Sequence, residues 1–304
     1  MNGILDGLAR LRLLAGFFCL AVVSGSIGAR ADGPTSPYYL DNYVTQTIYV
    51  VQGTSVINSF PWAYSTGGAP SQEGNLAIAN GFLTTNAFGT GYDIGFAPAT
   101  GGQYTLAGVP TGVSHTVQQT PGTAYDYQFG GTSDGTYNYT VQDWGVPPGG
   151  GYTENVIRTD LNWQNPVVLF NIQTAPGAHD EYVGITYDPT NNSLWVGGWS
   201  LTTISDFSMT GTVLSSFNTG VATSGAALAL DPADNTLWLA YDTSGSLWQY
   251  SKSGTLLQTV VPSGLPGNGY YSGQFAAAPE PASLVLFGTC LIGLVGAARR
   301  RMKK

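Results

Sequence analysis

Few stretches of this 304-residue sequence bring together side chains that could carry out acid–base or nucleophilic chemistry. His179-Asp180-Glu181 places an imidazole beside two carboxylates, the residue types used in general acid–base catalysis. Ser133 lies in Gly131-Thr132-Ser133-Asp134-Gly135, which has the spacing of a nucleophile elbow, a strained strand-to-helix turn. Tyr137-Asn138-Tyr139, which follows, is typical of a strand. We therefore expect an exposed polar loop at His179, an ordinary turn at Ser133, and no catalytic residues.

Two Asp-Pro turns offer oxygen ligands of the kind that Ca²⁺ accepts. The oxygen-bearing residues of these turns are Asp188, Asn192, Asp231, Asp234 and Asn235. Asp and Asn are also the residues that tight turns require, so a metal is not needed to explain them. We expect no cofactor, with Ca²⁺ at these turns as the alternative. The two cysteines, Cys19 and Cys290, lie in the terminal apolar segments, and His115 and His179 are the only histidines, which excludes most zinc patterns.

The distribution of charge excludes nucleic acid as a partner. The net charge is -8, and only Arg158 and Lys252 are basic between Asp32 and Ala278. A domain with so few cations cannot neutralise many phosphates. Charged residues are 9% of the sequence and glycine occurs 42 times, a composition that suits short strands and turns.

Tryptophan is the other residue type with a chemical use, since an exposed indole can stack on a sugar ring. The sequence has seven tryptophans. Three occupy positions of an internal repeat and are expected in the core: Trp195, Trp238 and Trp248. Three others fall in predicted loops or outer strands and are expected at the surface: Trp62, Trp144 and Trp163.

That internal repeat determines the expected architecture. Asp188-Pro189-Thr190-Asn191-Asn192-Ser193-Leu194-Trp195-Val196 recurs as Asp231-Pro232-Ala233-Asp234-Asn235-Thr236-Leu237-Trp238-Leu239, an offset of 43 residues. Gly211 and Gly254, in the following hairpins, keep the same offset of 43 residues. Two independent landmarks in one register indicate a true repeat.

Each repeat has the alternating apolar pattern and turn residues of two hairpins, and four strands in about 43 residues is the size of a propeller blade. Further hairpin turns are predicted at Gly53, Gly112 and Asn165. The strands from Tyr43 to Phe60 lack a preceding inner pair, and Tyr270 to Ala277 could supply an inner strand that closes the ring. We therefore predict an all-β fold, a β-propeller of about five blades over residues 32–278, with a β-sandwich as the alternative.

The N-terminus has the features of a signal peptide over residues 1–31. Arg10 and Arg12 precede an apolar run of about 11 residues, which is too short to span a bilayer. Ala29-Arg30-Ala31 has the A-x-A pattern of a signal-peptidase site, with cleavage expected after Ala31. We therefore expect the protein to be exported through the Sec translocon.

The C-terminus combines three elements in a fixed order. Pro279-Glu280-Pro281 precedes an apolar segment from Ala282 to Ala298, and the basic residues Arg299, Arg300 and Arg301 follow. About 17 apolar residues is the lower limit for a spanning helix. The arginines should stay on the cytoplasmic side and stop translocation, which leaves residues 32–278 on the far side of the membrane.

Together these elements resemble the PEP-CTERM sorting domain, over residues 279–304. The resemblance implies a Gram-negative source and processing near Pro279-Glu280-Pro281 by an exosortase, a membrane-embedded cysteine transpeptidase. The protein would be anchored in the inner membrane before processing and would then reach the cell surface or the extracellular matrix. The central hairpins also resemble propellers of the broad YVTN and NHL-type group, a likeness that implies a fold and no catalytic residues.

Two classes of function remain open from the sequence. In the first, a non-catalytic propeller acts as a binding or structural module, with exopolysaccharide as the candidate ligand. In the second, the protein is a secreted hydrolase or lyase that uses the central channel. The sequence shows no convergent set of His, Asp and nucleophile, which favours the first.

Overall fold

The computed structural model describes residues 33–65, 73–87, 89–91, 100–123, 125–146, 151–174, 180–222, 227–241 and 244–276. The chain divides into two compact units, Met1–Asp32 and Gly33–Lys304, and every described residue belongs to the second. The predicted signal peptide and sorting tail, with Ala29, Ala31, Pro279–Pro281 and Arg299–Arg301, lie outside these residues. None of the described ranges contains a helix long and apolar enough to span a membrane.

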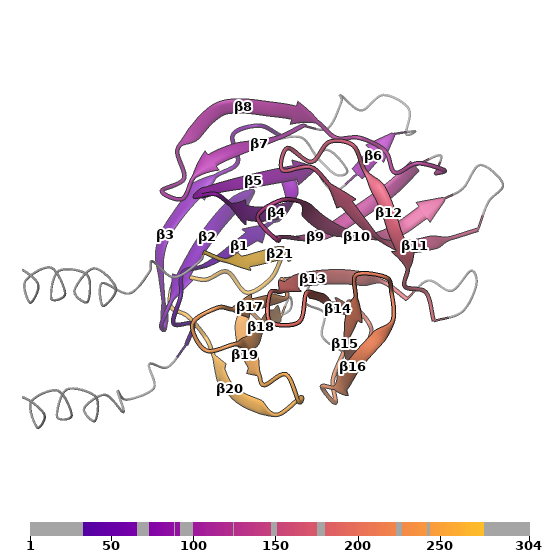
Figure 1. Ribbon diagram of the computed structural model, residues 1–304. Coiled ribbons are helices and arrows are strands. Elements are labelled where there is room, and N and C mark those ends of the chain that lie inside the picture. Colours follow the sequence, from indigo (N-terminus) through magenta and orange to yellow (C-terminus); the bar gives the residue numbers. More distant parts are fainter. Residues whose placement is uncertain are drawn as a thin grey trace, which may run out of the picture. The chain divides into compact units, whose positions relative to one another are not determined.

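The described residues form an all-β propeller of five blades, as predicted (Figure 1). The β-sandwich alternative is not favoured. From the axis outward, the blades are as follows. Blade 1 contains β21 (Tyr270–Phe275), β1 (Tyr38–Asn42), β2 (Thr47–Gln52) and β3 (Ser55–Pro61). Blade 2 contains β4 (Glu73–Ala79), β5 (Phe82–Ala87), β7 (Thr100–Thr105) and β8 (Pro110–Thr116).

The remaining three blades continue in chain order. Blade 3 contains β9 (Tyr125–Ser133), β10 (Asn138–Val146), β11 (Thr153–Thr159) and β12 (Val167–Asn171), and the short β6 (Gly89–Gly91) pairs with the inner edge of β9. Blade 4 contains β13 (Tyr182–Asp188), β14 (Ser193–Gly198), β15 (Thr203–Ser208) and β16 (Val213–Asn218). Blade 5 contains β17 (Ala229–Asp231), β18 (Thr236–Tyr241), β19 (Ser246–Tyr250) and β20 (Leu256–Val260).

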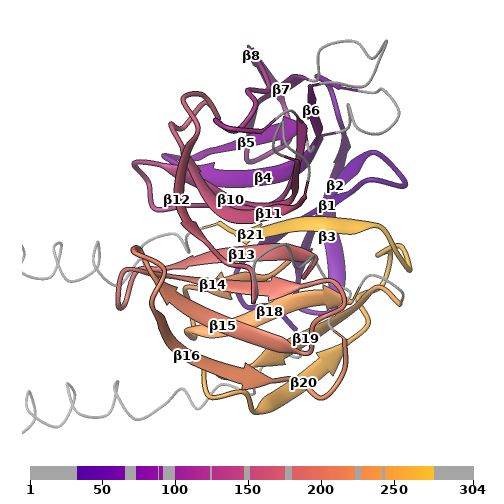
Figure 2. The same ribbon diagram turned by 90° about the vertical axis from the view of Figure 1, so that its right-hand side faces the viewer.

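The ring is closed by the two ends of the described chain. The gold strand β21 lies beside the indigo strand β1 in both views (Figures 1 and 2), and the two pair antiparallel from Tyr38 opposite Phe275 to Asn42 opposite Tyr270. The predicted inner strand at the C-terminal end is therefore confirmed. The N-terminal end supplies three strands and not two, since β1 also belongs to blade 1. Pairing the ends covers the inner edge of β1, which would otherwise lack a neighbouring strand.

The 43-residue repeat is visible in the strand register. Trp195 in β14 lies opposite Thr186 and Asp206, and Trp238 in β18 lies opposite Ala229 and Gln249. Each of these partners is displaced by the same 43 residues. Both indoles are buried, at 1% and 0% exposure, so the two tryptophans occupy equivalent places in adjacent blades.

Four of the five predicted outer hairpin turns lie where expected, at Gly53, Asn165, Gly211 and Gly254. The turn predicted at Gly112 is wrong, since it lies at Gly108, whose N–H donates to the Thr105 carbonyl at 2.9 Å. Gly112 is inside β8, close to a register irregularity in its pairing with β7. Both glycines have positive φ, so sequence alone could not distinguish the turn from the irregular strand position.

The core consists of hydrophobic layers between neighbouring blades. Four buried clusters lie between blades 1 and 5, 3 and 4, 1 and 2, and 4 and 5. A repeated contact joins the outer hairpin turns of blades 2, 4 and 5 to the preceding blade. A Cβ added to Gly108, Gly211 or Gly254 would lie 2.3 to 2.7 Å from a phenylalanine of the preceding blade, namely Phe60, Phe170 and Phe217. These turns therefore need glycine for close approach as well as for φ.

The face between blades 2 and 3 is polar where the others are apolar. Trp163 Nε1 donates to Thr84 Oγ1 at 3.2 Å, and Asn138 Nδ2 approaches the same oxygen at 3.5 Å. Gly131 brings its backbone against the Leu76 carbonyl, since an added Cβ would lie 2.2 Å from that oxygen. Buried Asn75 and Asn86 and half-buried His115 each have at least one buried polar atom without a hydrogen-bond partner among the described residues.

Candidate binding cavity

Hydrogen bonds between the inner strands of neighbouring blades position the side chains around the axis. Thr132 Oγ1 accepts from the Tyr187 N–H at 3.0 Å, joining blade 3 to blade 4. Thr186 Oγ1 accepts from the Leu230 N–H at 3.0 Å, joining blade 4 to blade 5. Inner strands of a propeller splay apart and do not form a common ladder, so side-chain hydroxyls satisfy backbone groups that would otherwise be buried unpaired.

Blade 1 is joined to blade 2 in the same way. Ser272 Oγ accepts from the Leu76 N–H at 3.0 Å, and Gln274 Oε1 accepts from the Ile78 N–H at 2.7 Å. Gln274 Nε2 also donates to the Ile78 carbonyl at 3.4 Å. These bonds hold the inner strands at a spacing that leaves an axial space.

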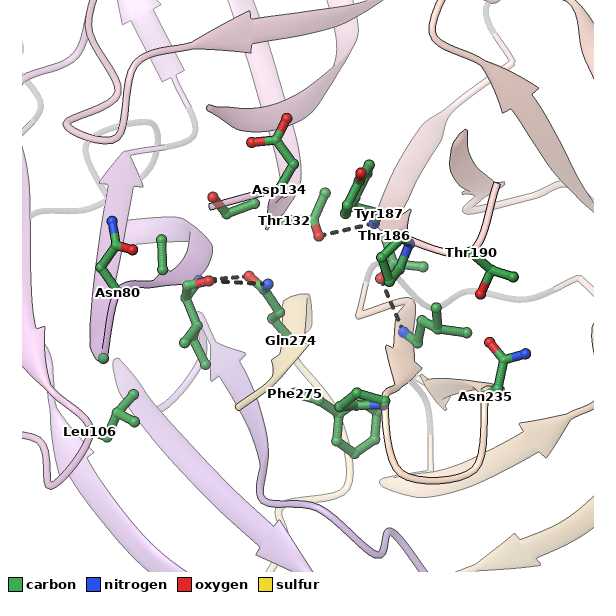
Figure 3. Close-up of a pocket in the computed structure, with 17 residues that line it drawn as sticks. Asn80, Leu106, Thr132, Asp134, Thr186, Tyr187, Thr190, Asn235, Gln274 and Phe275 are labelled. Atoms are coloured by element: carbon green, nitrogen blue, oxygen red, sulfur yellow. Dashed lines mark hydrogen bonds between the residues drawn. The ribbon is translucent and has the colours of Figure 1, made fainter. Parts of the chain in front are cut away.

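At the end of the axis where the inner hairpins turn, this space is a cavity of about 540 Å³ (Figure 3). It is lined by residues of all five blades, among them Gln274 and Phe275 of β21, Thr132 of β9 and Thr186 of β13. Exposed turn residues form its rim: Asn80, Pro189, Thr190, Pro232 and Asn235. A volume of this size lies in the range of small-molecule and sugar sites.

The lining combines apolar side chains with uncharged polar groups and carries almost no charge. Its hydrogen-bonding side chains are amides and hydroxyls, and Asp134 is the only ionisable carboxyl among the lining residues. Asp134 is already occupied: Oδ1 accepts from the N–H groups of Thr136 and Tyr137 at 2.7 Å, and Oδ2 accepts from the Tyr139 hydroxyl at 2.6 Å. Burial, together with the bond to Asp134, raises the pKa of Tyr139, which stays protonated. The cavity therefore suits a ligand with hydroxyl groups and no net charge.

At the opposite ends of the inner strands, aromatic rings from three blades meet across the axis. The Tyr271 ring stacks on Tyr43 with centroids 4.1 Å apart, and it meets Phe129 of blade 3 edge-on at 5.1 Å. Trp199, after β14 of blade 4, lies 5.9 Å from the same ring. All four rings are partly exposed. These aromatic side chains occupy the axis at that level, about 13 Å along β21 from Phe275.

Buried carboxyls lie near this aromatic end. Glu154 Oε1 accepts from the N–H groups of Asp180 and Glu181 at 2.8 and 3.0 Å, which fixes the entry to blade 4. Burial raises the pKa of Glu154 to about 8, and burial with the Glu181 charge raises the pKa of Asp143 to about 7. Among the described residues, no three His, Cys, Asp or Glu side chains are arranged to hold a metal ion.

Of the serine and histidine residues considered for chemistry from the sequence, Ser133 and His115 are described, and they lie in different blades. Ser133 is the last residue of β9, at the edge of the β9–β10 turn between two strands, where its Oγ donates to the Tyr137 carbonyl at 2.8 Å and accepts from the Gly135 N–H. His115 is in β8 of blade 2, and burial lowers its pKa to about 4, so it is neutral. His179 lies outside the described residues.

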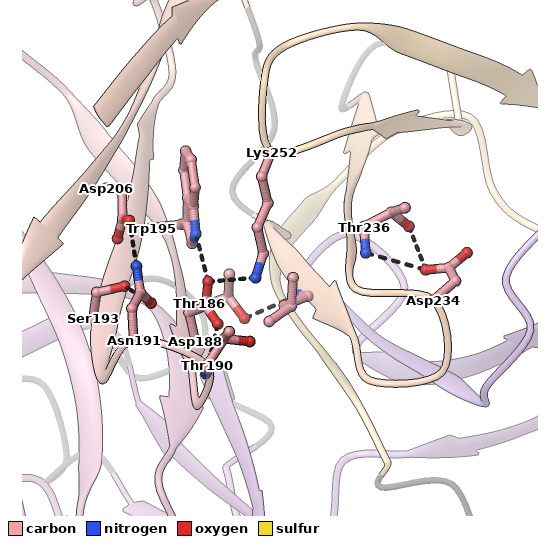
Figure 4. Close-up of polar contacts among 11 residues, drawn as sticks. Thr186, Asp188, Thr190, Asn191, Ser193, Trp195, Asp206, Asp234, Thr236 and Lys252 are labelled. Carbon is pink, nitrogen blue, oxygen red and sulfur yellow. Dashed lines mark hydrogen bonds and ion pairs between the residues drawn. The ribbon is translucent and has the colours of Figure 1, made fainter. Parts of the chain in front are cut away.

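The Asp-Pro turns fasten neighbouring blades. Asp188 forms an ion pair with Lys252 of blade 5 at 2.6 Å and accepts from Trp195 Nε1 at 3.2 Å (Figure 4). Asp231 accepts from Ser36 Oγ at 2.8 Å, which fastens blade 5 to the segment before β1. Two of the candidate Ca²⁺ ligands, Asp188 and Asp231, thus have protein partners, and the partner of Asp188 is a cation.

The tryptophan predictions are partly wrong. Trp195 and Trp238 are buried as expected, and Trp248 is partly exposed. Trp62 and Trp163 were expected at the surface but are buried, at 4% and 1% exposure, because their indole N–H groups reach Asp41 and Thr84 inside the blade interfaces. The side chain of Trp144 lies outside the described residues.

Sequence reasoning did not identify the cavity. The side chains that build it, Thr132, Thr186 and Gln274, lie on inner strands in ordinary β sequence. Asn80-Gly81 is a recognisable hairpin turn, but which turns gather at one end of the axis depends on the closed ring. The Asn80-Gly81 turn motif was the only feature of the sequence that pointed to residues of this cavity.

Comparison with known families identifies the C-terminal segment. The family described as the PEP-CTERM protein-sorting motif matches residues 277–301. The chain therefore carries this sorting signal, which implies exosortase-dependent export and membrane anchoring before cleavage. None of the curated proteins matches the chain.

Solved structures share the fold only distantly. A functionally unknown protein from Desulfotomaculum acetoxidans is 13% identical, with 80% of this chain and 100% of that chain covered and a TM-score of 0.48. Myxococcus xanthus glutaminyl cyclase is 12% identical, with 66% and 75% covered and a TM-score of 0.43. The periplasmic gluconolactonase PpgL of Pseudomonas aeruginosa is 13% identical, with 77% and 70% covered and a TM-score of 0.43. Likenesses at this level assign no activity to this chain.

Proposed function

We propose that this protein is an exported, non-catalytic binding module whose propeller holds a neutral, hydroxyl-rich polymer, an exopolysaccharide, at the cavity on its axis. The observation that carries the proposal is the chemistry of the cavity: uncharged amide and hydroxyl groups stand among apolar side chains around about 540 Å³, and the one carboxyl of the lining is occupied by three donors. Such groups match sugar hydroxyls, which donate and accept hydrogen bonds without charge.

The rest of the domain supports a neutral or cation-bridged ligand. Arg158 and Lys252 are the basic residues of the segment from Asp32 to Ala278. Lys252 is paired with Asp188, and the Arg158 guanidinium lies 4.4 Å above the Tyr137 ring. Neither cation is placed at the cavity, so an anionic polymer would need a bridging cation. The sorting signal supports a site of action at the cell surface or in the extracellular matrix.

A glycan array probed with the domain of residues 32–278 tests the proposal. Asn80 and Asn235 stand on the cavity rim with positive φ, so Asn80→Gly and Asn235→Gly remove the amides while suiting the backbone. Each amide lost should weaken binding about tenfold, the effect of one hydrogen bond of about 1.4 kcal/mol. Asn165→Gly is the matched control, a positive-φ asparagine in the outer β11–β12 turn.

Binding that survives the combination of Asn80→Gly and Asn235→Gly would place the ligand away from the cavity. The absence of binding to any glycan would refute the polysaccharide proposal. Release of soluble fragments from a bound glycan would identify an enzyme in place of a binding module.

A further inference from the structure

The place where the chain leaves the propeller determines which face can approach the membrane. β21 is the innermost strand of blade 1, and its last residues, Gln274 and Phe275, line the cavity. Ala276 is buried and its N–H donates to the Pro37 carbonyl at 3.0 Å. The fold thus holds the chain up to Ala276, and the sorting motif begins at the next residue.

The segment before β1 lies at the same end of the axis. Ser36 and Thr35 donate to Asp231, and the turn that follows Asp231 contributes Pro232 and Asn235 to the cavity. Both ends of the described chain therefore leave the propeller on the face that carries the cavity mouth. We call this surface, formed by the inner hairpin turns around the cavity, the cavity face.

The connection to the apolar segment is short. Residues 277–281 separate Ala276 from Ala282, so six Cα–Cα steps of at most about 3.5 Å reach about 20 Å. To turn the opposite face toward the membrane, the connection would have to cross one blade and descend its full height. Three strand spacings of about 4.8 Å and a six-residue strand of about 3.3 Å per residue add to more than about 30 Å.

We infer that the cavity face is the surface turned toward the membrane and its sorting peptidase while the chain is uncut, and that cleavage uncovers the cavity. The connection is too short for the reverse orientation, and its exit beside the axis keeps the cavity mouth within about 20 Å of the start of the apolar segment. The peptidase that acts at Pro279–Pro281 must work in the space between the cavity face and the membrane. The inference uses the proposed cavity as a location and does not require its ligand to be a polysaccharide.

The electrostatics of this face fit a protein neighbour better than an anionic lipid surface. Turn carboxylates stand on or near it, with Asp134 and Asp234 in inner turns and Asp160 in an outer turn. Lys252, a cation of the neighbouring outer turn, is neutralised by Asp188. A face with this charge is not drawn to anionic lipids, whose attraction acts on clusters of Lys and Arg. The short connection, and not adhesion, keeps it near the bilayer.

Single-cysteine labelling tests the inference without any ligand. Residues 32–278 contain no cysteine, and Cys19 lies in the predicted signal peptide. After removal of that peptide, Cys290→Ala therefore leaves the uncut chain free of thiols. Thr190→Cys places a thiol on the cavity rim, and Val44→Cys places one on the opposite face, where Val44 is 52% exposed. The full chain is kept uncut in spheroplasts that lack the sorting peptidase, and it is treated with N-ethylmaleimide or with a maleimide on a polyethylene glycol of about 5 kDa.

In the uncut chain, N-ethylmaleimide should label both positions at similar rates, whereas the large reagent should label Thr190→Cys at least about fivefold more slowly than Val44→Cys. Inserting about ten Gly and Ser residues after Ala276 should abolish that difference, because the reach of the connection increases. Ending the chain at Ala276 should abolish it too.

Equal labelling by the large reagent in the uncut chain would overturn the inference. So would slow labelling of Thr190→Cys that persists after truncation, because the protection would then come from the propeller itself. Neither result depends on glycan binding, so this inference and the proposed function can fail separately.

Discussion

At the residue scale, the propeller is held by buried polar groups with specific partners. Glu73 is fully buried and accepts hydrogen bonds from the N–H groups of Tyr64 and Ser65 and from the hydroxyls of Thr85 and Tyr104. Burial raises its pKa despite these donors. Glu154 plays the same part at the entry to blade 4. Each carboxyl satisfies backbone groups at a blade junction that no strand ladder reaches.

The raised pKa of Glu154 predicts a stability that depends on pH. Burial lifts this pKa from about 4.5 to about 8, with the charges of Asp143 and Asp180 adding to the effect. The folded state then binds the proton of Glu154 more tightly than the unfolded state does. This proton binding therefore stabilises the fold fully below about pH 4, and the stabilisation is lost as the pH rises to about 8. The pKa of Asp143, raised to about 7, acts in the same direction.

Glu154→Gln should therefore flatten the pH dependence, since the amide keeps the acceptor oxygen and cannot ionise. A pKa that moves from about 4.5 to about 8 corresponds to about 5 kcal/mol, which screening by solvent reduces. Between about pH 5 and about pH 8.5 the variant should lose at least about 2 kcal/mol less free energy of unfolding than the wild type. Urea titrations at the two pH values measure this. An unchanged slope would show that Glu154 does not change its proton uptake on folding.

At the element scale, closely packed hairpin turns fix the spacing of the blades. The outer turns of blades 2, 4 and 5 each rest on a phenylalanine of the blade before, as Gly254 does on Phe217. Beneath the turn, the same phenylalanine lies 5.6 Å from the Tyr250 ring, and Phe170 lies 5.7 Å from Phe207 in the equivalent place. The glycine and the aromatic pair form one repeated joint.

Gly254→Ala should cost more than Gly112→Ala, although both glycines have a φ of +85°. At Gly112 nothing lies within 4 Å of the added Cβ, so only backbone strain of about 1–2 kcal/mol is expected. At Gly254 the Cβ would lie 2.5 Å from Phe217 Cβ, which should add about 1–3 kcal/mol of overpacking. The free energies of unfolding of the two variants decide this. Equal losses of unfolding free energy would mean that Phe217 moves away from the added Cβ without destabilising the fold.

At the scale of the whole molecule, the sorting tail and the fold are joined without a spacer. Ala276, the last of the described residues, is hydrogen-bonded to the fold, and the sorting motif matches from residue 277. Truncation inside β21 would remove the strand that closes the ring, whereas truncation after Ala276 leaves every described strand in place. Processing at Pro279–Pro281 is thus compatible with a folded propeller.

Replacing Pro279, Glu280 and Pro281 by alanine should leave a full-length protein in the membrane fraction. The apolar segment from Ala282 to Ala298 is too apolar to leave lipid, and Arg299–Arg301 resist translocation. Deleting everything from Pro279 onward should release a soluble periplasmic or secreted form. Fractionation in the native host measures both variants. Surface display of the triple variant equal to that of the wild type would show that the motif plays no part in sorting.

The amino-acid sequence by itself determined much of the strand pattern and the sorting motif at the C-terminus. The offset of 43 residues predicted equivalent strands in blades 4 and 5, and Tyr270–Ala277 was identified as a closing strand because hydrophobic alternation and turn residues are local signals. The sorting motif was also legible, since its parts stand in fixed order. The turn at Gly112 was misplaced because two nearby glycines carry the same local signal.

Only the tertiary structure decided what the residues do across the ring. Trp62 and Trp163 are buried because partners more than 20 residues away in the sequence, Asp41 and Thr84, accept their N–H groups. The cavity exists because closure brings turns from blades far apart in the chain to one end of the axis, beside the exit of β21. Such placements depend on the closed ring, a long-range property that no local pattern encodes.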